Sequence, residues 1–244
     1  MIRSEDLGDR VLLLTIDRDE RRNALDIEHI DELHDLLEAG LGRGARAVVV
    51  TGAGSVFSAG ADLDGVYGDE FRTALYRALG ALRNASVPVI AALNGPAIGA
   101  GALLAIACDL RVGGDRARFA VPTARNGLAV DAWTVRRLAL LTNGAVARNL
   151  LLGAGTLPSD DALRLGLLSR SGDLEVAVAW AREIAEMAPL SLAYSKKTLD
   201  RLFESSRGDE TELDELFDQC WHSDDVAEGR RAREEGREPV FQGR

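Results

Sequence analysis

The feature that most constrains this chain is the stretch 87–108, VPVIAALNGPAIGAGALLAIAC, which contains no charged side chain. Residues 87–93 are apolar and have the length of a strand, and the Asn-Gly-Pro triplet at 94–96 predicts a turn. Residues 99–107 have the small and aliphatic side chains of a buried helix. The stretch therefore predicts a strand, a turn and a helix in the core.

The glycines at the start of this helix, Gly99 and Gly101, give the stretch a possible function. The first N–H groups of a helix have no partner within it, and such groups bind anions. The alternative interpretation is a core strand and helix that bind no ligand, since most such units bind nothing at the turn. A membrane span also fits the length, but the triplet at 94–96 would leave backbone groups unpaired in lipid, and no basic cluster flanks the stretch closely. We expect no transmembrane segment.

Composition narrows the class of ligand. The chain has 244 residues and a formal net charge of -10, which disfavours nucleic acid and anionic membranes as partners. A polyanionic ligand must therefore meet a local basic cluster. The three histidines have no metal-site spacing, so we expect no metal. Two distant cysteines and a charged first segment without a signal sequence favour the cytoplasm.

The remaining pattern predicts an α/β core followed by helices. Apolar runs predict strands at 11–17, 47–51, 110–112 and 118–120, and amphipathic spacing predicts helices at 27–39 and 69–83. Residues 122–127 are expected to form a loop, and the rest of the chain is helical in pattern. Asp131, just before a helical stretch, is expected on this evidence alone to cap it. We predict a core domain at 1–188 and a helical C-terminal region at 189–244.

Five stretches, taken in order, resemble the crotonase (enoyl-CoA hydratase/isomerase) family. They are RRNALD at 21–26, FSAGADL at 57–63, PVIAALNGPAIGAG at 88–101, ACDLRV at 107–112, and the closing REPVFQGR. The resemblance implies an α/β crotonase-like spiral of ββα repeats with a C-terminal helical oligomerisation region. It also implies a homotrimer or a dimer of trimers, an acyl-CoA thioester as ligand, and no cofactor besides the coenzyme A of that ligand.

The resemblance also assigns site residues. The oxyanion hole for the thioester oxygen falls on the backbone N–H groups of Ala61 and Ala100, although the family usually has glycine at the second position. Only the N–H is needed, so a methyl group is tolerated where the local φ is negative. The positions that contact the coenzyme A correspond to Arg21 and Arg22 at the nucleotide, and to Ala24, Ser58, Ala59, Asp62 and Leu63 along the rest of it. Without the resemblance, the two arginines would be interpreted as a solvated turn.

The departures from the family concern the two catalytic glutamates of hydratases. Leu103 and Thr123 stand in their positions and are expected to line the substrate pocket. Hydration needs a base to activate water and an acid to protonate carbon, so hydratase activity is not expected. Trp133, where many hydratases have glycine, is expected to narrow the pocket. The stretch DAWTVRRL at 131–138 resembles that of actinobacterial family members labelled probable enoyl-CoA hydratases, which lack both glutamates.

One carboxylate, Asp131, lies in a loop that resembles the loop carrying the catalytic aspartate of dienoyl-CoA isomerases. Two hypotheses follow. The chain is an acyl-CoA-binding protein of lipid metabolism without hydratase chemistry, or it is an enoyl-CoA or dienoyl-CoA isomerase in which Asp131 moves the proton. We expect a medium or long acyl chain along helix 69–83. We also expect subunit contacts through the apolar stripe Leu213, Leu216, Phe217 and Trp221.

Overall fold

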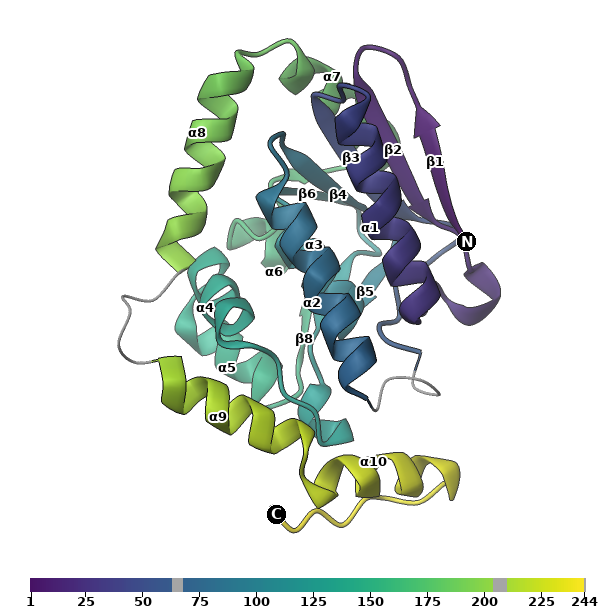
Figure 1. The fold of residues 1–244 in the computed structure, drawn as a ribbon, viewed down its shortest axis with the longest axis vertical. Helices are drawn as coiled ribbons and strands as arrows, with labels where there is room; N and C mark the ends of the chain where they lie inside the picture. Colours follow the sequence, from purple (N-terminus) through teal and green to yellow (C-terminus); the bar gives the residue numbers. More distant parts are fainter. Residues whose placement is uncertain (63–67, 204–209, 244) are drawn as a thin grey trace.

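A computed structural model describes residues 1–62, 68–203 and 210–243, without the side chains of residues 203 and 210–213 (Figure 1). Its larger sheet has six strands, in the order β1 (Ile2–Asp6), β2 (Val11–Ile16), β3 (Ala47–Gly52), β4 (Val89–Leu93), β6 (Leu110–Gly113) and β9 (Arg170–Ser171). Only β1 runs antiparallel to its neighbour. Strands β2, β3 and β4 are buried along their whole length, which explains their continuous apolar sequence.

Alternate residues of these strands face two separate parts of the core. Leu12, Leu14 and Val48 belong to the larger cluster, which is covered by α1 (Ile27–Gly42), α2 (Asp69–Asn84) and α3 (Ala100–Ala107). Leu13 and Val49 belong to a smaller cluster, covered by α7 (Leu174–Ala185). The sheet therefore has helices on both faces, as its parallel strands require.

The second sheet contains three short strands, β5 (Pro96–Ile98), β7 (Arg118–Ala120) and β8 (Thr156–Pro158). The predicted turn at 94–96 is wrong at its last residue, because Pro96 begins β5. Proline is tolerated there because it is the first residue of an edge strand. Ala97 is fully buried opposite Phe119, so tertiary pairing extends the backbone where local turn chemistry favours a bend.

The second half of the chain is mainly helical, as predicted. It contains α4 (Ala132–Leu141), α5 (Gly144–Leu151), α6 (Ser159–Arg164), α8 (Pro189–Asp200), α9 (Glu210–Trp221) and α10 (Asp224–Glu234). Short 3₁₀ turns occur at η1 (Asp19–Arg21), η2 (Thr123–Asn126) and η3 (Arg201–Phe203). Within the described ranges, no helix is both long and apolar enough to cross a membrane.

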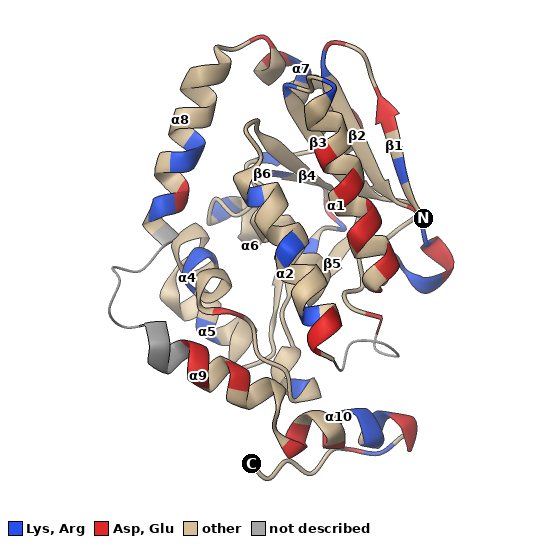
Figure 2. Ribbon diagram, in the orientation of Figure 1, with Lys and Arg blue, Asp and Glu red and all other residues tan. Residues whose placement is uncertain are grey.

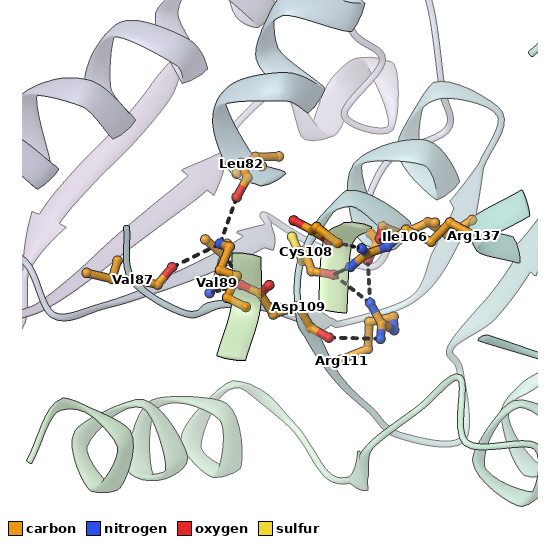
Figure 3. Close-up of polar contacts among 11 residues, drawn as sticks. Leu82, Val87, Val89, Ile106, Cys108, Asp109, Arg111 and Arg137 are labelled. Carbon is orange, nitrogen blue, oxygen red and sulfur yellow. Dashed lines mark hydrogen bonds and ion pairs between the residues drawn. The ribbon is translucent and has the colours of Figure 1, made fainter. Parts of the chain in front are cut away.

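A buried lysine joins the C-terminal region to the core. The Nζ atom of Lys196, on α8, donates to the carbonyl oxygens of Leu82 and Val87 at 3.0 Å each and lies 2.8 Å from a carboxylate oxygen of Asp109. The same carboxylate accepts the N–H of Val89, at the start of β4 (Figure 3). All three ammonium hydrogens thus have acceptors, and the charge remains compensated although it is buried.

The aromatic residues near the end of α9 also pack within the chain. The Phe217 ring lies 5.8 Å from that of Tyr76 on α2 and 6.2 Å from that of Trp221. The indole N–H of Trp221 donates to the carbonyl oxygen of Ala129 at 3.2 Å. Two members of the apolar stripe predicted to face other subunits therefore cover this chain's own core. Leu216 is half exposed. The side chain of Leu213 lies outside the described residues, and the trimer stays a prediction.

Replacing Lys196 by methionine should lower the free energy of unfolding by about 3–5 kcal/mol, because Asp109 would be left buried without its cation. Denaturant unfolding measures the difference. Lys197→Met is the matched control, since Lys197 is the next residue of the same helix and is exposed. Equal stability of the two variants would contradict the assigned role of Lys196.

Candidate functional site

A cavity of about 210 Å³ lies between the start of α3, helix α2 and the C-terminal helices. Its wall comes from segments far apart in the sequence: Ala59, Gly60, Ala61, Phe71, Leu75, Tyr76, Ile98, Gly99, Ala100, Leu103, Pro122, Thr123, Asn126, Leu128, Ala129, Val130 and Trp221. Most of these residues are apolar. The cavity is thus suited to an apolar group that carries one polar end.

Two backbone N–H groups meet in this wall. Ala61 forms a parallel bridge with Leu25, in which Leu25 N donates to Gly60 O at 2.8 Å and Asp62 N donates to Leu25 O at 2.7 Å. In such a bridge the N–H of the middle residue, Ala61, points away from the partner segment. Ala100 is the first residue of α3, and the first N–H groups of a helix have no acceptor within it. Both residues line the cavity.

A glycine lets these two segments approach each other. Gly60 has φ +101°, and a Cβ atom there would lie 2.7 Å from the carbonyl oxygen of Ile98 and 3.4 Å from the nitrogen of Ala100. A side chain at this position would therefore force the segments apart. The φ of Ala100 is not positive, and this is the condition under which a methyl group was expected to be tolerated in place of glycine.

The opposite end of α3 is held by two buried guanidinium groups (Figure 3). Arg111 donates to the carbonyl oxygens of Ala105 and Cys108, at 3.2 and 2.8 Å. Arg137 donates to those of Ile106 and Cys108, at 2.7 and 3.0 Å. Burial lowers the pKa of Arg111 to about 10, so it stays charged at neutral pH. The carbonyl groups that a helix leaves unpaired at its C-terminus are thus bonded to cations.

The two residues expected from the resemblance to replace the hydratase glutamates both reach the cavity. Leu103, on α3, and Thr123, at the start of η2, line its wall. Among the described residues of the wall, Tyr76 is the one titratable side chain, and none is a carboxylate, a histidine or a lysine. The described part of the chain also contains no group of His, Cys, Asp and Glu side chains that could hold a metal ion.

Asp131 caps α4, as the residues alone predict. Its side chain accepts the N–H of Thr134 at 3.2 Å, and its own backbone N–H donates to the Tyr76 hydroxyl at 3.1 Å. Burial raises the pKa of its carboxyl group, while the hydrogen bonds from Thr134 act in the opposite direction. It directly follows Val130 of the wall but does not itself line the cavity. The carboxylate therefore lies next to the cavity, and it accepts a hydrogen bond from the first turn of α4.

Trp133 is placed away from the cavity wall. Its ring packs between two guanidinium groups, with Arg83 at 4.7 Å and Arg137 at 5.0 Å from its centre. Arg83 lies in the last turn of α2 and Arg137 on α4, so the ring packs against these two helices. The structure thus gives no support to the expectation that Trp133 narrows the pocket, and gives it a packing role.

The residues expected to contact coenzyme A divide into two groups. Arg21 and Arg22 are exposed at the η1 turn, which carries both signs of charge (Figure 2), and Ala24 is half-buried next to them. Ala59 lines the cavity, and its N–H donates to Arg22 O at 2.9 Å. This bond joins the arginine turn to the cavity wall.

The second group has structural partners instead. Ser58 is fully buried, and its hydroxyl donates to Asn23 O at 2.8 Å. Asp62 forms an ion pair with Arg18 at 2.9 Å. Neither residue lines the cavity, so the structure does not support direct ligand contacts for them. Leu63 lies outside the described residues.

Asn23 and Tyr76 are site-forming residues that the sequence pattern did not single out. Asn23 is buried with φ +56°, and its amide donates to the carbonyl oxygens of Ala53 at 2.9 Å and Val56 at 2.7 Å. Asparagine tolerates this left-handed conformation, which is the signal available within RRNALD. Tyr76 occupies an ordinary helical position, and only the tertiary structure shows that it reaches the cavity.

Comparisons with known proteins show the family. The family model described as enoyl-CoA hydratase/isomerase matches residues 6–244. The chain is 42% identical to probable enoyl-CoA hydratase echA6 of Mycobacterium tuberculosis over 239 residues, covering 97% of each chain. It is 32% identical to 2,3-dehydroadipyl-CoA hydratase of Escherichia coli, covering 96% of each.

Solved structures show the same fold. An enoyl-CoA hydratase/isomerase from Pseudoalteromonas atlantica superposes with a TM-score of 0.85 at 32% identity and covers 99% of each chain. A methylmalonyl-CoA decarboxylase superposes with a TM-score of 0.87 at 22% identity, covering 100% of this chain and 98% of its own, which is a likeness of fold alone. The predicted crotonase-like α/β fold with C-terminal helices is thereby confirmed. The chain belongs to the enoyl-CoA hydratase/isomerase, or crotonase, family.

Proposed function

We propose that this protein binds an acyl-CoA thioester, with the thioester oxygen between the N–H groups of Ala61 and Ala100, and does not hydrate the acyl group. The observation that carries the proposal is the composition of the cavity wall. The backbone N–H groups of Ala61 and Ala100 belong to that wall, and so do Leu103 and Thr123, which the family resemblance assigns to the positions of the hydratase glutamates. The described wall can therefore polarise a carbonyl group but has no carboxylate to activate water.

The electrostatics of α3 support an oxygen at this point. The dipoles of a helix sum to about half a positive charge at its N-terminus, where Ala100 lies. Burial of the helix reduces screening by water, which strengthens this field at the cavity. A thioester oxygen, which becomes more negative when polarised, is stabilised by such donors.

The coenzyme A is proposed to leave the cavity along Ala59 toward Arg21 and Arg22. These exposed arginines would supply the local positive charge that an acidic chain needs to hold a phosphate. The names of the relatives support a CoA thioester, since they include a hydratase of 2,3-dehydroadipyl-CoA. A role in lipid metabolism, a cytoplasmic location and a trimer or dimer of trimers belong to the same proposal.

An isomerase that uses Asp131 is the second candidate. One observation favours it: the carboxyl group is partly desolvated, with a raised pKa, beside a wall residue of the cavity. A desolvated carboxylate is a stronger base than an exposed one. Against it, this carboxylate caps α4 and does not line the cavity. We therefore favour the binding function.

Replacing Arg21 and Arg22 together by alanine should weaken binding of every acyl-CoA by a similar factor, about 10-fold or more, because phosphate contacts do not depend on the acyl group. Calorimetry with acyl-CoAs of several chain lengths measures this. A double replacement of the exposed Arg116 and Arg118 by alanine controls for the loss of two positive charges. Unchanged affinity in the first variant would refute the proposed nucleotide contact.

Hydration of crotonyl-CoA by the wild-type protein should be absent or roughly 10⁴-fold slower than in a typical hydratase, since two acid/base groups are missing. The absorbance of the conjugated thioester follows the reaction. Leu103→Ala, which enlarges the cavity without adding a carboxylate, should remain equally inactive. Robust hydration by the wild type would show that other groups perform the chemistry.

Incubation in deuterated water separates the binding function from the isomerase. A protein that only binds should introduce no deuterium at C2 or C4 of a 3-enoyl-CoA or a dienoyl-CoA, as mass spectrometry would show. The control is Asp131→Asn, which keeps a capping oxygen for α4 but removes the base. Exchange by the wild type that disappears in this variant would establish the isomerase instead.

A further inference from the structure

Tyr76 is the feature of the cavity that thioester binding leaves unexplained. It lies on α2, lines the cavity and packs edge-on against Phe217, with ring centres 5.8 Å apart and planes at 81°. Its hydroxyl oxygen accepts the backbone N–H of Asp131 at 3.1 Å. The phenol is thus held between α2, α4 and α9, so its orientation is fixed before any ligand enters.

The hydrogen of this hydroxyl is left for a ligand. Within the described part of the chain, the Tyr76 hydroxyl takes part in one hydrogen bond, and in that bond it is the acceptor. A phenol has one hydrogen to donate in addition to the lone pairs with which it accepts. Burial and the charge of Asp131 raise the pKa of Tyr76, so the group keeps its hydrogen at neutral pH. It is a donor and not a base.

The other polar side chains of the described wall are differently placed. Thr123 and Asn126 both belong to η2. The indole N–H of Trp221 is already bonded to Ala129 O. Among the described wall residues of α2, Tyr76 carries a hydroxyl group, whereas Phe71 and Leu75 are apolar.

We propose that Tyr76 makes the site selective for an acyl group that carries an oxygen atom beyond the thioester carbonyl, such as a 3-oxo or 3-hydroxy group. This inference rests on the proposed acyl-CoA binding. A plain hydrocarbon chain would displace water from the hydroxyl and leave its hydrogen without an acceptor. An unpaired buried donor is unfavourable, so a site built around one rejects a ligand that lacks the matching oxygen.

The size of the cavity indicates which ligands to test. Its volume of about 210 Å³ is many times the roughly 10–15 Å³ that one water needs, so an acyl group of four carbons is a suitable size to test. Acetoacetyl-CoA, 3-hydroxybutyryl-CoA and butyryl-CoA thus compare a ketone, a hydroxyl and no oxygen in a chain of one length.

Calorimetric titration of the full-length protein with these three ligands tests the inference. The wild type should bind the two oxygenated ligands about 10-fold more tightly than butyryl-CoA. Tyr76→Phe should lose this preference and bind butyryl-CoA at least as well as before. Tyr194→Phe, a change of the same kind at a tyrosine 72% exposed on α8, should behave as the wild type.

The outcomes separate the two proposals. Equal affinity of the wild type for all three ligands would overturn the selectivity and leave acyl-CoA binding intact. If the protein binds none of the three ligands and no longer acyl-CoA either, both proposals are overturned. The wild-type comparison stands without any variant, so it decides the question even if Tyr76→Phe is less stable. A preference that persists in a folded Tyr76→Phe protein would assign the selectivity to another group.

Discussion

The position of helix α3 is the constraint on which the site depends. Its N-terminal residue, Ala100, supplies one of the two N–H groups of the cavity, so any shift of the helix moves that donor. The helix is uncharged and buried along its whole length, and its C-terminal carbonyl groups are bonded to Arg111 and Arg137. The guanidinium groups hold the C-terminus of α3 in position. At its N-terminus the first N–H groups have no acceptor within the helix, so the positive end of its dipole faces the cavity.

The C-terminal region completes the site from the same chain. Lys196 ties α8 to the end of α2 and to Asp109, and Trp221 of α9 closes the cavity beside Ala129. Helix α10 packs against η2, where Gly229 lies against the backbone of Asn126. The region predicted to form subunit contacts thus also contributes to the cavity wall. Leu190, Tyr194 and Leu199 on α8 are exposed.

The sequence predicts those elements whose conformation is determined by neighbouring residues, and it misses those determined by tertiary contacts. The uncharged stretch 87–108 predicts β4 and α3, because strand and helix patterns are local. Strand β5 was not predicted, because Pro96 and Ala97 are extended only by pairing with β7. Motif resemblance pairs Ala61 with Ala100, and both residues line the same cavity. It did not reveal that Ser58 and Asp62 bond to Asn23 and Arg18, or that Tyr76 and Trp221 both line the cavity.

The most direct test of the account is the infrared carbonyl frequency of bound butyryl-CoA labelled with ¹³C at the thioester carbon. The proposed hydrogen bonds from Ala61 and Ala100 would polarise this carbonyl, so its stretching band should move to lower frequency than that of the free ligand in water. A bound ligand whose band stays at the free position, or moves to higher frequency, would show that the thioester oxygen does not lie between these N–H groups.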